Sequence, residues 1–214
     1  KITGAGTNVI KIIGVQKLKD TGYKVMQDRI EAGTLLCAGA ITGGNICLNY
    51  KNANHITPIL NKLEEAGCNI KVEKNRIYMQ APKKLKAVDI KTMPYPGFPT
   101  DMQSIFASIL TTAKGTSVIV ENIFENRYRY TAELNKMGAK ITTEGKTAVI
   151  KGVRKLSGAT VKSTDLRGGA SMILAGLCAK GMTTVTNIEY ILRGYENLDK
   201  KLNELGAKIS IQKE

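Results

Sequence analysis

The sequence carries one pattern three times: an aspartate, an apolar stretch with helical spacing, a glycine turn and a strand-like segment. The copies begin at Asp28 (DRIEAGTLLCAGAITGG), Asp101 (DMQSIFASILTTAKG) and Asp165 (DLRGGASMILAGLCAKG), so the spacings are 73 and 64 residues. Periods above about 50 residues fit a small repeated domain better than a solenoid unit. The pattern therefore predicts an α/β protein built from a repeated unit.

A second marker follows the same period. Leucine and glycine close a helix into a strand in LNKLEEAGCNI, ELNKMGAKI and KLNELGAKI, and the glycines concerned are Gly67, Gly138 and Gly206. Glycine is the residue that most often ends a helix in the left-handed conformation. We therefore expect a helix to end and a strand to begin at each of these three glycines.

A third marker is a segment with alternating apolar residues. It begins at Asn8 (NVIKIIGVQKL), at Arg76 (RIYMQAPKKLKAVDIKT) and at Thr147 (TAVIKGVRKLSGATVKST). Such alternation is typical of strands, and we expect each segment to form a two-stranded ribbon. Each repeat then reads strand, helix, strand, helix, strand, strand, or a permutation of that order.

The repeats are incomplete at both ends. Residues 1–27 hold a ribbon with no helices before it, and the last copy stops after the strand of KLNELGAKISI. Because each unit needs partner strands to close its core, we interpret the chain as about half of a larger protein. The expected division is a ribbon at 1–27, which completes a repeat of a missing domain, and one domain at 28–214. Its repeats span about 28–92, 93–164 and 165–214.

Composition bounds the class of protein. A hydrophobic content of 43%, with 5% aromatic residues and no tryptophan, predicts a core of Ile, Leu, Val and Ala. No apolar run approaches the ~18–20 residues of a membrane span, and the first residues do not read as a signal peptide, so we expect a soluble, cytoplasmic protein. The cysteines lie in apolar segments without a C-x-x-C pair, which favours buried, reduced thiols over disulfides, zinc or catalysis. They are Cys37, Cys47, Cys68 and Cys178.

The formal charge of +14 calls for an anionic counterpart. Such a field attracts phosphates, nucleic acid or acidic lipid. The lysines are scattered, however, and neither an arginine-rich arm nor an aromatic platform for nucleic acid is present. A solvated basic surface is therefore favoured, and a polyanion-binding domain is kept as the alternative.

The three aspartates are the first candidates for chemistry. Each precedes a helix, where a carboxylate commonly accepts hydrogen bonds from the free amides of the first turn. Asp101 differs from the others because Pro94, Pro96 and Pro99 stiffen the chain before it. Helix N-termini attract anions, so a carboxylate base and a phosphate could be neighbours at this place.

Three arginines are the second group of candidates. Arg167 follows Asp165 and precedes two glycines, which let the backbone approach a partner. Arg127 and Arg193 lie in equivalent loops of successive repeats, and arginine forks bind carboxylate or phosphate, so a shared anion site and a surface salt bridge both remain open. His55 is the only histidine, and without a partner it supports neither a triad nor a metal cluster.

Four segments carry a family resemblance: PGFPTDMQ, IFENRYRY, TDLRGGASMILAG and RGYENLDKKLNELGA. In this order and spacing they resemble the C-terminal half of the UDP-N-acetylglucosamine 1-carboxyvinyltransferases, the bacterial enolpyruvyl transferases that begin peptidoglycan synthesis. The resemblance covers essentially all 214 residues. FPTDMQ together with FENR separates the chain from relatives in the shikimate pathway.

The resemblance implies the enolpyruvyl transferase fold, an inside-out α/β barrel of repeated βαβαββ units that is incomplete in this chain. In this family two such domains form a cleft at the converging N-termini of their helices. The enzyme joins the 3′-hydroxyl of UDP-N-acetylglucosamine to C2 of phosphoenolpyruvate and then releases phosphate. No metal or organic cofactor, nucleic acid or membrane is implied, and the full-length protein is expected to be a monomer.

The resemblance also implies roles for individual residues. Asp101 would be the base that takes the proton of the sugar hydroxyl. Thr100, Ile123 and Phe124 would contact the nucleotide sugar, Ile123 through its backbone. The residues of the phosphoenolpyruvate side would be Asp165, Arg167 and Arg193, with Arg127 holding the closed state.

Some functional residues of the family have no counterpart here. The loop cysteine that donates a proton, a substrate-binding lysine and asparagine, and several arginines belong to the other half, and none of the four cysteines matches that position. We therefore expect this chain to be inactive without the missing N-terminal half. A vestigial interaction module is a further alternative.

Overall fold

The computed structural model describes residues 1–5, 7 and 9–212, and its middle part forms one complete βαβαββ unit. In chain order that unit contains β6 (Ile90–Lys91), α3 (Gln103–Leu110), β7 (Thr116–Val120), α4 (Tyr130–Lys136), β8 (Lys140–Glu144) and β9 (Thr147–Lys151). Its sheet has the strand order β6-β7-β9-β8, in which β6 and β7 are parallel and the other pairs antiparallel. The predicted order of strands and helices is confirmed here.

The flanking units contain fewer strands. The first unit comprises α1 (Arg29–Thr42), β3 (Asn45–Asn49), the 3₁₀ turn η1 (Ala53–Ile56), α2 (Thr57–Glu65), β4 (Asn69–Glu73) and β5 (Arg76–Gln80), and its antiparallel sheet has the order β3-β5-β4. The last unit comprises β10 (Thr160–Lys162), α5 (Leu166–Cys178), β11 (Thr184–Thr186), α6 (Glu189–Leu192) and α7 (Leu198–Glu204). Its two strands pair in parallel.

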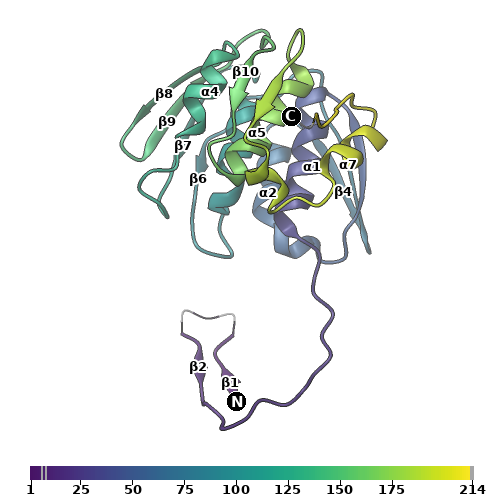
Figure 1. Cartoon of the computed structure of the whole chain (residues 1–214), viewed down its shortest axis with the longest axis vertical. Coiled ribbons are helices and arrows are strands. Elements are labelled where there is room, and N and C mark those ends of the chain that lie inside the picture. The colour runs from purple at the N-terminus through teal and green to yellow at the C-terminus, as the bar shows by residue number, and fades with distance from the viewer. Residues whose placement is uncertain (6, 8, 213–214) are drawn as a thin grey trace.

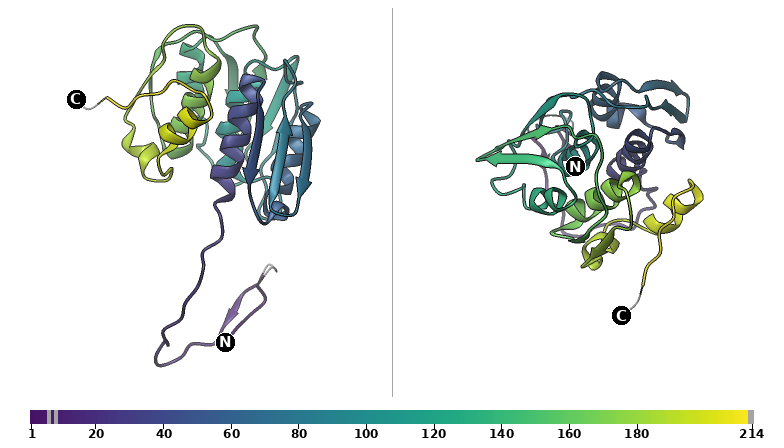
Figure 2. Two further views of the ribbon diagram at one scale, coloured as in Figure 1. Left: turned by 90° about the vertical axis from the view of Figure 1, so that its right-hand side faces the viewer. Right: turned by 90° about the horizontal axis from the view of Figure 1, so that it is seen from above.

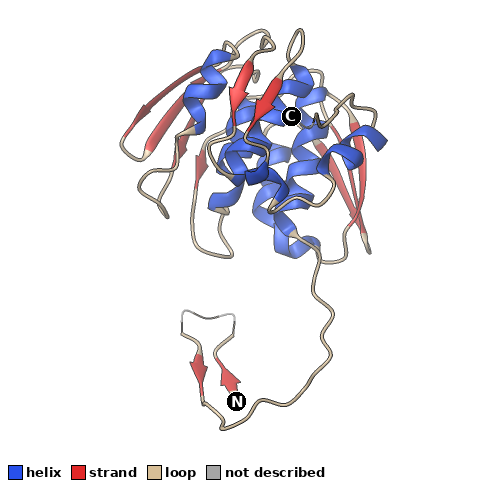
Figure 3. Ribbon diagram, viewed as in Figure 1, coloured by secondary structure: helices blue, strands red, loops and turns tan. Residues whose placement is uncertain are grey.

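Helices occupy the centre and sheets the outside (Figure 3). Helices α1, α3 and α5 pack against one another, and every residue of α3 is buried. Gly169 permits close packing at the start of α5, because a Cβ there would lie 2.3 Å from Ser163 Oγ. This arrangement is the predicted inside-out α/β fold, and it brings the beginnings of α3 and α5 to one end of the molecule.

The predicted helix closures are confirmed. Gly67, Gly138 and Gly206 have φ angles of +101°, +88° and +98°, and they follow α2, α4 and α7. In this left-handed region glycine avoids the steric cost that a side chain would add. Each glycine therefore turns the chain out of its helix.

The predicted ribbons are wrong in their pairing. The segment from Arg76 contains β5 and β6, but β5 pairs with β3 and β4 while β6 pairs with β7 of the next unit. The segment from Thr147 is divided in the same way between β9 and β10. Alternation of apolar residues specifies a strand with one buried face, but it does not specify which strand lies beside it.

The N-terminal arm (residues 1–27) extends away from the rest of the chain (Figures 1 and 2). It holds the short antiparallel strands β1 (Ile2–Thr3) and β2 (Lys11–Ile12). The expected ribbon began at Asn8, which lies outside the described residues, and β2 covers only part of its remaining length. Apolar side chains of the arm are solvent-exposed, as for Val9 at 72% and Ile12 at 67%.

The predicted last strand does not form. Residues 207–212 follow α7 as irregular chain, and no strand of the described structure pairs with them. A strand in this position needs a hydrogen-bonded neighbour, because its own residues cannot satisfy its backbone groups. We call residues 207–212 the C-terminal tail.

The cysteine prediction is confirmed only in part. All four thiols are free, and burial raises the pKa of Cys68 and of half-buried Cys178 to about 11. Cys37 is also buried, but Cys47 is exposed on β3, so the expectation of a buried thiol is wrong for Cys47.

Among the helices of the described residues, none combines the length and the apolar character needed to cross a bilayer.

Candidate active site

Asp101 is presented by a short rigid turn. The proline-containing loop is closed by hydrogen bonds from Met93 N to Phe98 O and from Gly97 N to Pro94 O, at 2.9 and 2.8 Å. It leads into the 3₁₀ turn η2 (Thr100–Met102), which precedes α3. The capping interpretation is wrong for Asp101, because α3 begins after this turn without a side-chain cap. Its carboxylate is free to bind other groups.

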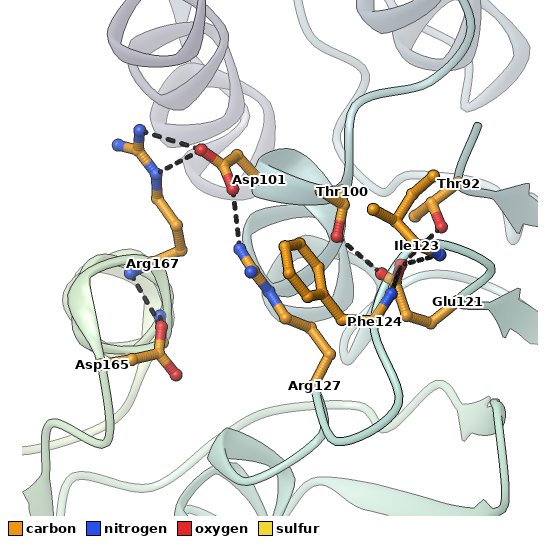
Figure 4. A network of polar contacts seen from close by, with 10 residues as sticks. Thr92, Thr100, Asp101, Glu121, Ile123, Phe124, Arg127, Asp165 and Arg167 are labelled. Atoms are coloured by element: carbon orange, nitrogen blue, oxygen red, sulfur yellow. Dashed lines mark hydrogen bonds and ion pairs between the residues drawn. The ribbon is translucent and has the colours of Figure 1, made fainter. Parts of the chain in front are cut away.

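Two arginines from different elements bind the Asp101 carboxylate (Figure 4). Arg127 Nη2 lies 2.7 Å from Asp101 Oδ1, and Arg127 belongs to the loop between β7 and α4. Arg167, in the first turn of α5, places Nη2 at 3.2 Å and Nε at 3.4 Å from Asp101 Oδ2. Each carboxylate oxygen thus accepts from one guanidinium. The predicted residues Asp101, Arg127 and Arg167 form one cluster.

Arg167 is held on its other side by Tyr195. Its Cζ lies 5.2 Å from the centre of the Tyr195 ring, and Tyr195 Oη lies 2.9 Å from Thr34 Oγ1 of α1. Burial lowers the pKa of the Arg167 guanidinium, but Tyr195 and Asp101 outweigh this effect and the pKa is raised. The Nη1 atom of Arg167 is buried without a partner in the described structure. A cation fixed in this way has donor capacity left for an anion.

Asp28 and Asp165 do cap their helices. Asp28 accepts from the amides of Ile30 and Glu31, and Asp165 accepts from the amides of Arg167 and Gly168 at 3.0 and 2.9 Å. The Asp165 carboxylate therefore lies in the same turn as Arg167, beside the cluster of Asp101 (Figure 4). Its side chain orients the beginning of α5.

Glu121 is a site residue that the sequence analysis missed. It follows β7 directly, is 1% exposed, and its Oε1 accepts from Thr92 Oγ1 at 2.8 Å and from the amides of Ile123 and Phe124 at 2.8 and 3.2 Å. Its Oε2 accepts from Thr100 Oγ1 at 2.8 Å. The available signal was a carboxylate ending the apolar run TSVIV, because an acidic residue is almost never buried without dedicated partners.

The loop after Glu121 exposes two apolar side chains. Ile123 and Phe124 are 39% and 49% exposed, and Cζ of Arg127 lies 5.0 Å from the centre of the Phe124 ring. Exposed apolar groups beside a charged cluster are suited to cover a bound ligand. The loop therefore joins an apolar contact surface to the Asp101–Arg127 pair.

Arg193 lies outside this cluster. It caps the C-terminal end of α6, is exposed, and forms no side-chain hydrogen bond or ion pair with any described residue. Arg127 instead pairs with Asp101, and the described residues show no group that Arg127 and Arg193 both bind. Within the described ranges, no group of three or more His, Cys, Asp or Glu side chains is arranged to hold a metal ion.

A cavity of about 170 Å³ lies at the opposite end of the three central helices. Its lining includes Ile41, Thr112 and Cys178, which mark the ends of α1, α3 and α5, together with Lys84 and Arg154. The Asp101 cluster lies at the beginnings of α3 and α5 instead. The candidate site is therefore separate from this cavity, and its Asp101 side chain is 39% exposed.

Known proteins resemble this chain over almost its whole length. The family model of EPSP synthase (3-phosphoshikimate 1-carboxyvinyltransferase) matches residues 1–202. A UDP-N-acetylglucosamine 1-carboxyvinyltransferase of Desulfofundulus thermocisternus is 52% identical over 210 residues, covering 98% of this chain and 86% of that protein. The protein of the same name from Thermodesulfovibrio yellowstonii is 53% identical, covering 98% of this chain and 50% of its own length. The chain spans about half the length of this second relative.

Solved structures agree with the fold. The enolpyruvyl transferase NikO from Streptomyces tendae superposes with a TM-score of 0.78 at 26% identity, covering 86% of this chain and 44% of that one. EPSP synthase from Acinetobacter baumannii gives a TM-score of 0.66 at 20% identity, covering 89% and 44%, and is similar in fold. The resemblance stated from sequence motifs and the predicted fold class are both confirmed.

Proposed function

The chain belongs to the UDP-N-acetylglucosamine 1-carboxyvinyltransferases, a family of enolpyruvyl transferases, and on this premise we propose that it supplies part of the active site for enolpyruvyl transfer. The reaction would transfer the enolpyruvyl group of phosphoenolpyruvate to the 3′-hydroxyl of UDP-N-acetylglucosamine and release phosphate. The observation that carries this proposal is the Asp101 carboxylate bound between Arg127 and Arg167. A base and two anion-binding groups are what the reaction requires of one side of a cleft.

Asp101 is the proposed general base. It takes the proton of the sugar 3′-hydroxyl while that oxygen forms a bond to C2 of phosphoenolpyruvate, and the C2–C3 double bond opens as C3 accepts a proton from the family's proton-donating cysteine in the other half. The tetrahedral intermediate then loses a proton from C3 and phosphate from C2, which restores the double bond. In the structure both carboxylate oxygens accept from arginines. An anionic substrate competes with Asp101 for the same guanidinium groups, so its arrival would release a carboxylate oxygen to accept the proton.

The arginines are proposed to bind the anionic groups of phosphoenolpyruvate. Arg167 has an unpartnered buried Nη1, which suits a phosphate or carboxylate oxygen. Arg193 has no described partner, and we propose that it reaches the substrate when the cleft closes. Asp165 keeps the first turn of α5, and with it Arg167, in position. Arg127 is proposed to hold the closed state beside Asp101.

The loop after β7 is proposed to bind the nucleotide sugar. Thr100, Ile123 and Phe124 surround the Glu121 carboxylate, and the two apolar side chains are exposed toward a ligand. Because Ile123 N already donates to Glu121, its carbonyl group is the backbone atom left for the sugar. The site is thereby divided into an apolar side and an arginine side.

The proposal assigns turnover to the complete protein rather than to these residues alone. The family's proton-donating cysteine and further substrate-binding residues have no match here, and the Thermodesulfovibrio yellowstonii relative extends over twice the matched length. We therefore propose that the other half of the enzyme is a required partner. Residues 1–27 would complete a repeat of the domain in that half, as the repeat pattern predicts. Both substrates are cytoplasmic metabolites, so we place the enzyme in the cytoplasm, as a monomer at full length.

Phosphate release tests the proposed function. The chain is assayed with UDP-N-acetylglucosamine and phosphoenolpyruvate, first alone and then mixed with the part of the Thermodesulfovibrio yellowstonii relative that lies outside the match. We expect release in the mixture only. Asp101→Asn should lower the rate by about 10²- to 10⁴-fold, which is the usual contribution of a general base.

The matched control is Asp199→Asn on α7, because Asp199 forms no hydrogen bond or ion pair in the described structure and should leave the rate unchanged. Activity of Asp101→Asn at the level of this control would refute the proposed base. If folded mixtures release no phosphate but bind unrelated oligonucleotides with a steep salt dependence, the polyanion-binding alternative is the better account.

A further inference from the structure

The Glu121 carboxylate is buried without a cation. None of the ion pairs of the described residues includes Glu121, although the side chain is 1% exposed. A carboxylate removed from water is costly unless hydrogen bonds surround it. Glu121 accepts four such bonds, so its burial is compensated entirely by neutral donors. Each donor is in turn fixed in place by the carboxylate.

The four donors come from both sides of the candidate site. Thr100 directly precedes Asp101, whereas Ile123 and Phe124 lie in the loop that carries Arg127 (Figure 4). The two sides therefore share one carboxylate as their common hydrogen-bond acceptor. No other described side chain hydrogen-bonds to both η2 and the amides of this loop.

Thr92 completes the arrangement from behind. Its hydroxyl accepts from Asn122 N at 2.9 Å and donates to Glu121, and Asn122 Nδ2 donates to Thr92 O at 3.1 Å. Hydrogen bonds thereby hold each of the three consecutive residues Glu121, Asn122 and Ile123 in place. A loop fixed in this way loses less backbone entropy when a ligand binds.

We infer that Glu121 is a positioning residue that fixes the Ile123–Phe124 loop relative to the Thr100–Asp101 turn and so sets the affinity for the nucleotide sugar. This inference rests on the proposed function, and it adds a residue that never touches the substrate. Its carboxylate acts only through the backbone amides and hydroxyl groups that it binds.

The geometry predicts which replacements are tolerated. In Glu121→Gln the amide oxygen can still accept from Thr92 and the loop amides, and the new NH₂ group faces the Thr100 hydroxyl, which is able to accept instead of donate. Glu121→Ala removes all four bonds. Thr92→Val removes one donor to the carboxylate and the acceptor of Asn122 N, with little change in shape, and leaves the carboxylate in place.

Steady-state kinetics of the reconstituted enzyme test the inference. We expect Glu121→Ala to raise the KM for UDP-N-acetylglucosamine by about tenfold or more while the KM for phosphoenolpyruvate changes less than about twofold. Glu121→Gln should stay within about threefold of the wild type for both substrates, and Thr92→Val should fall between the two. Glu144→Gln at the exposed end of β8 is the matched control. Equal changes in both KM values, or an unchanged KM for the sugar in Glu121→Ala, would overturn the inference.

A second measurement separates this inference from the proposed function. Amide hydrogen exchange of Ile123 and Phe124 is followed in the chain itself, without substrate. Exchange that is faster in Thr92→Val and Glu121→Ala, but unchanged in Glu121→Gln, supports the positioning role even if the reconstituted enzyme is inactive and the proposed function fails. Unchanged exchange in Thr92→Val, which is expected to fold, would overturn the positioning role while leaving the proposed function intact.

Discussion

The middle and last repeats share a turn but not the strand that follows it. In the middle repeat, Asn135 Nδ2 donates to Ile141 O and Asn135 Oδ1 accepts from Ile141 N, at 2.9 and 3.0 Å. In the last repeat, Asn203 forms the same two bonds with Ile209, both at 2.8 Å. Ile141 lies in β8, which pairs with β9, whereas Ile209 lies in the C-terminal tail.

The difference separates local from non-local structure. An asparagine, a glycine and a leucine within nine residues are enough to shape the turn, because all of its hydrogen bonds lie within the same segment. A strand needs a neighbour from a distant part of the chain or from another chain. The last repeat thus has the turn that would lead into a strand, but the described residues provide no partner for that strand.

The largest effect should appear when that partner is supplied. The amides of Lys208, Ser210 and Ile211 have no backbone acceptor in the described structure, so they should exchange quickly in the isolated chain. In the mixture with the remaining half of the family enzyme, pairing should slow them by about a hundredfold or more. Mass spectrometry of the C-terminal peptide measures this change, with β9, which pairs on both sides, as an internal control that is slow in both samples. Fast exchange in an active mixture would contradict the strand interpretation.

The next largest effect concerns the core of the two repeats. Ile119 of β7 is fully buried between β6 and β9, and Ile119→Ala should lower the free energy of unfolding by about 2–5 kcal/mol. Val185 of β11 is half-buried, with β10 as its only described neighbour strand, so Val185→Ala should cost about 1 kcal/mol. Urea denaturation provides both values. Similar losses of unfolding free energy in the two variants would mean that the core of the last repeat is already packed as fully as that of the middle repeat.

The sequence predicted the parts of the fold that are encoded locally. The three glycine closures, the capping by Asp28 and Asp165, and the order of helices and strands follow from short segments. The pairing of β5 with β3 and of β6 with β7 does not, because two strands with the same alternation are equally suited to either neighbour.

The sequence analysis identified those residues of the candidate site that belong to the repeated pattern or carry a conspicuous charge. Asp101, Arg127 and Arg167 stand out in the sequence, and the structure joins them. Glu121 was missed because the last repeat has Thr186 at the corresponding place, also followed by Asn-Ile, so the residue forms no part of the repeated pattern. Its role depends on bonds to Thr92 and Thr100, and that proximity exists only after folding.

A smaller difference should separate the two asparagines. Asn135→Ala removes two bonds from a partly buried turn that leads into a paired strand, and it should cost about 2 kcal/mol of stability. Asn203→Ala removes the same two bonds from an exposed turn, where water can replace them, so its cost should stay below about 1 kcal/mol. Thermal unfolding of the two variants measures the difference. If the values are equal, burial of the turn contributes nothing.

The smallest effect is an expected equality. Gly138 and Gly206 have φ angles of +88° and +98°, and a Cβ at either position would meet no atom within 4 Å. Alanine at these positions therefore adds only the backbone strain of the left-handed conformation, about 1–2 kcal/mol. Because this strain belongs to the turn and not to its surroundings, Gly138→Ala and Gly206→Ala should shift the urea midpoint equally, although one turn leads into a sheet and the other into the tail. A clearly smaller cost at Gly206 would show that its turn opens in the isolated chain, and the local origin of the shared turn would then be disproved.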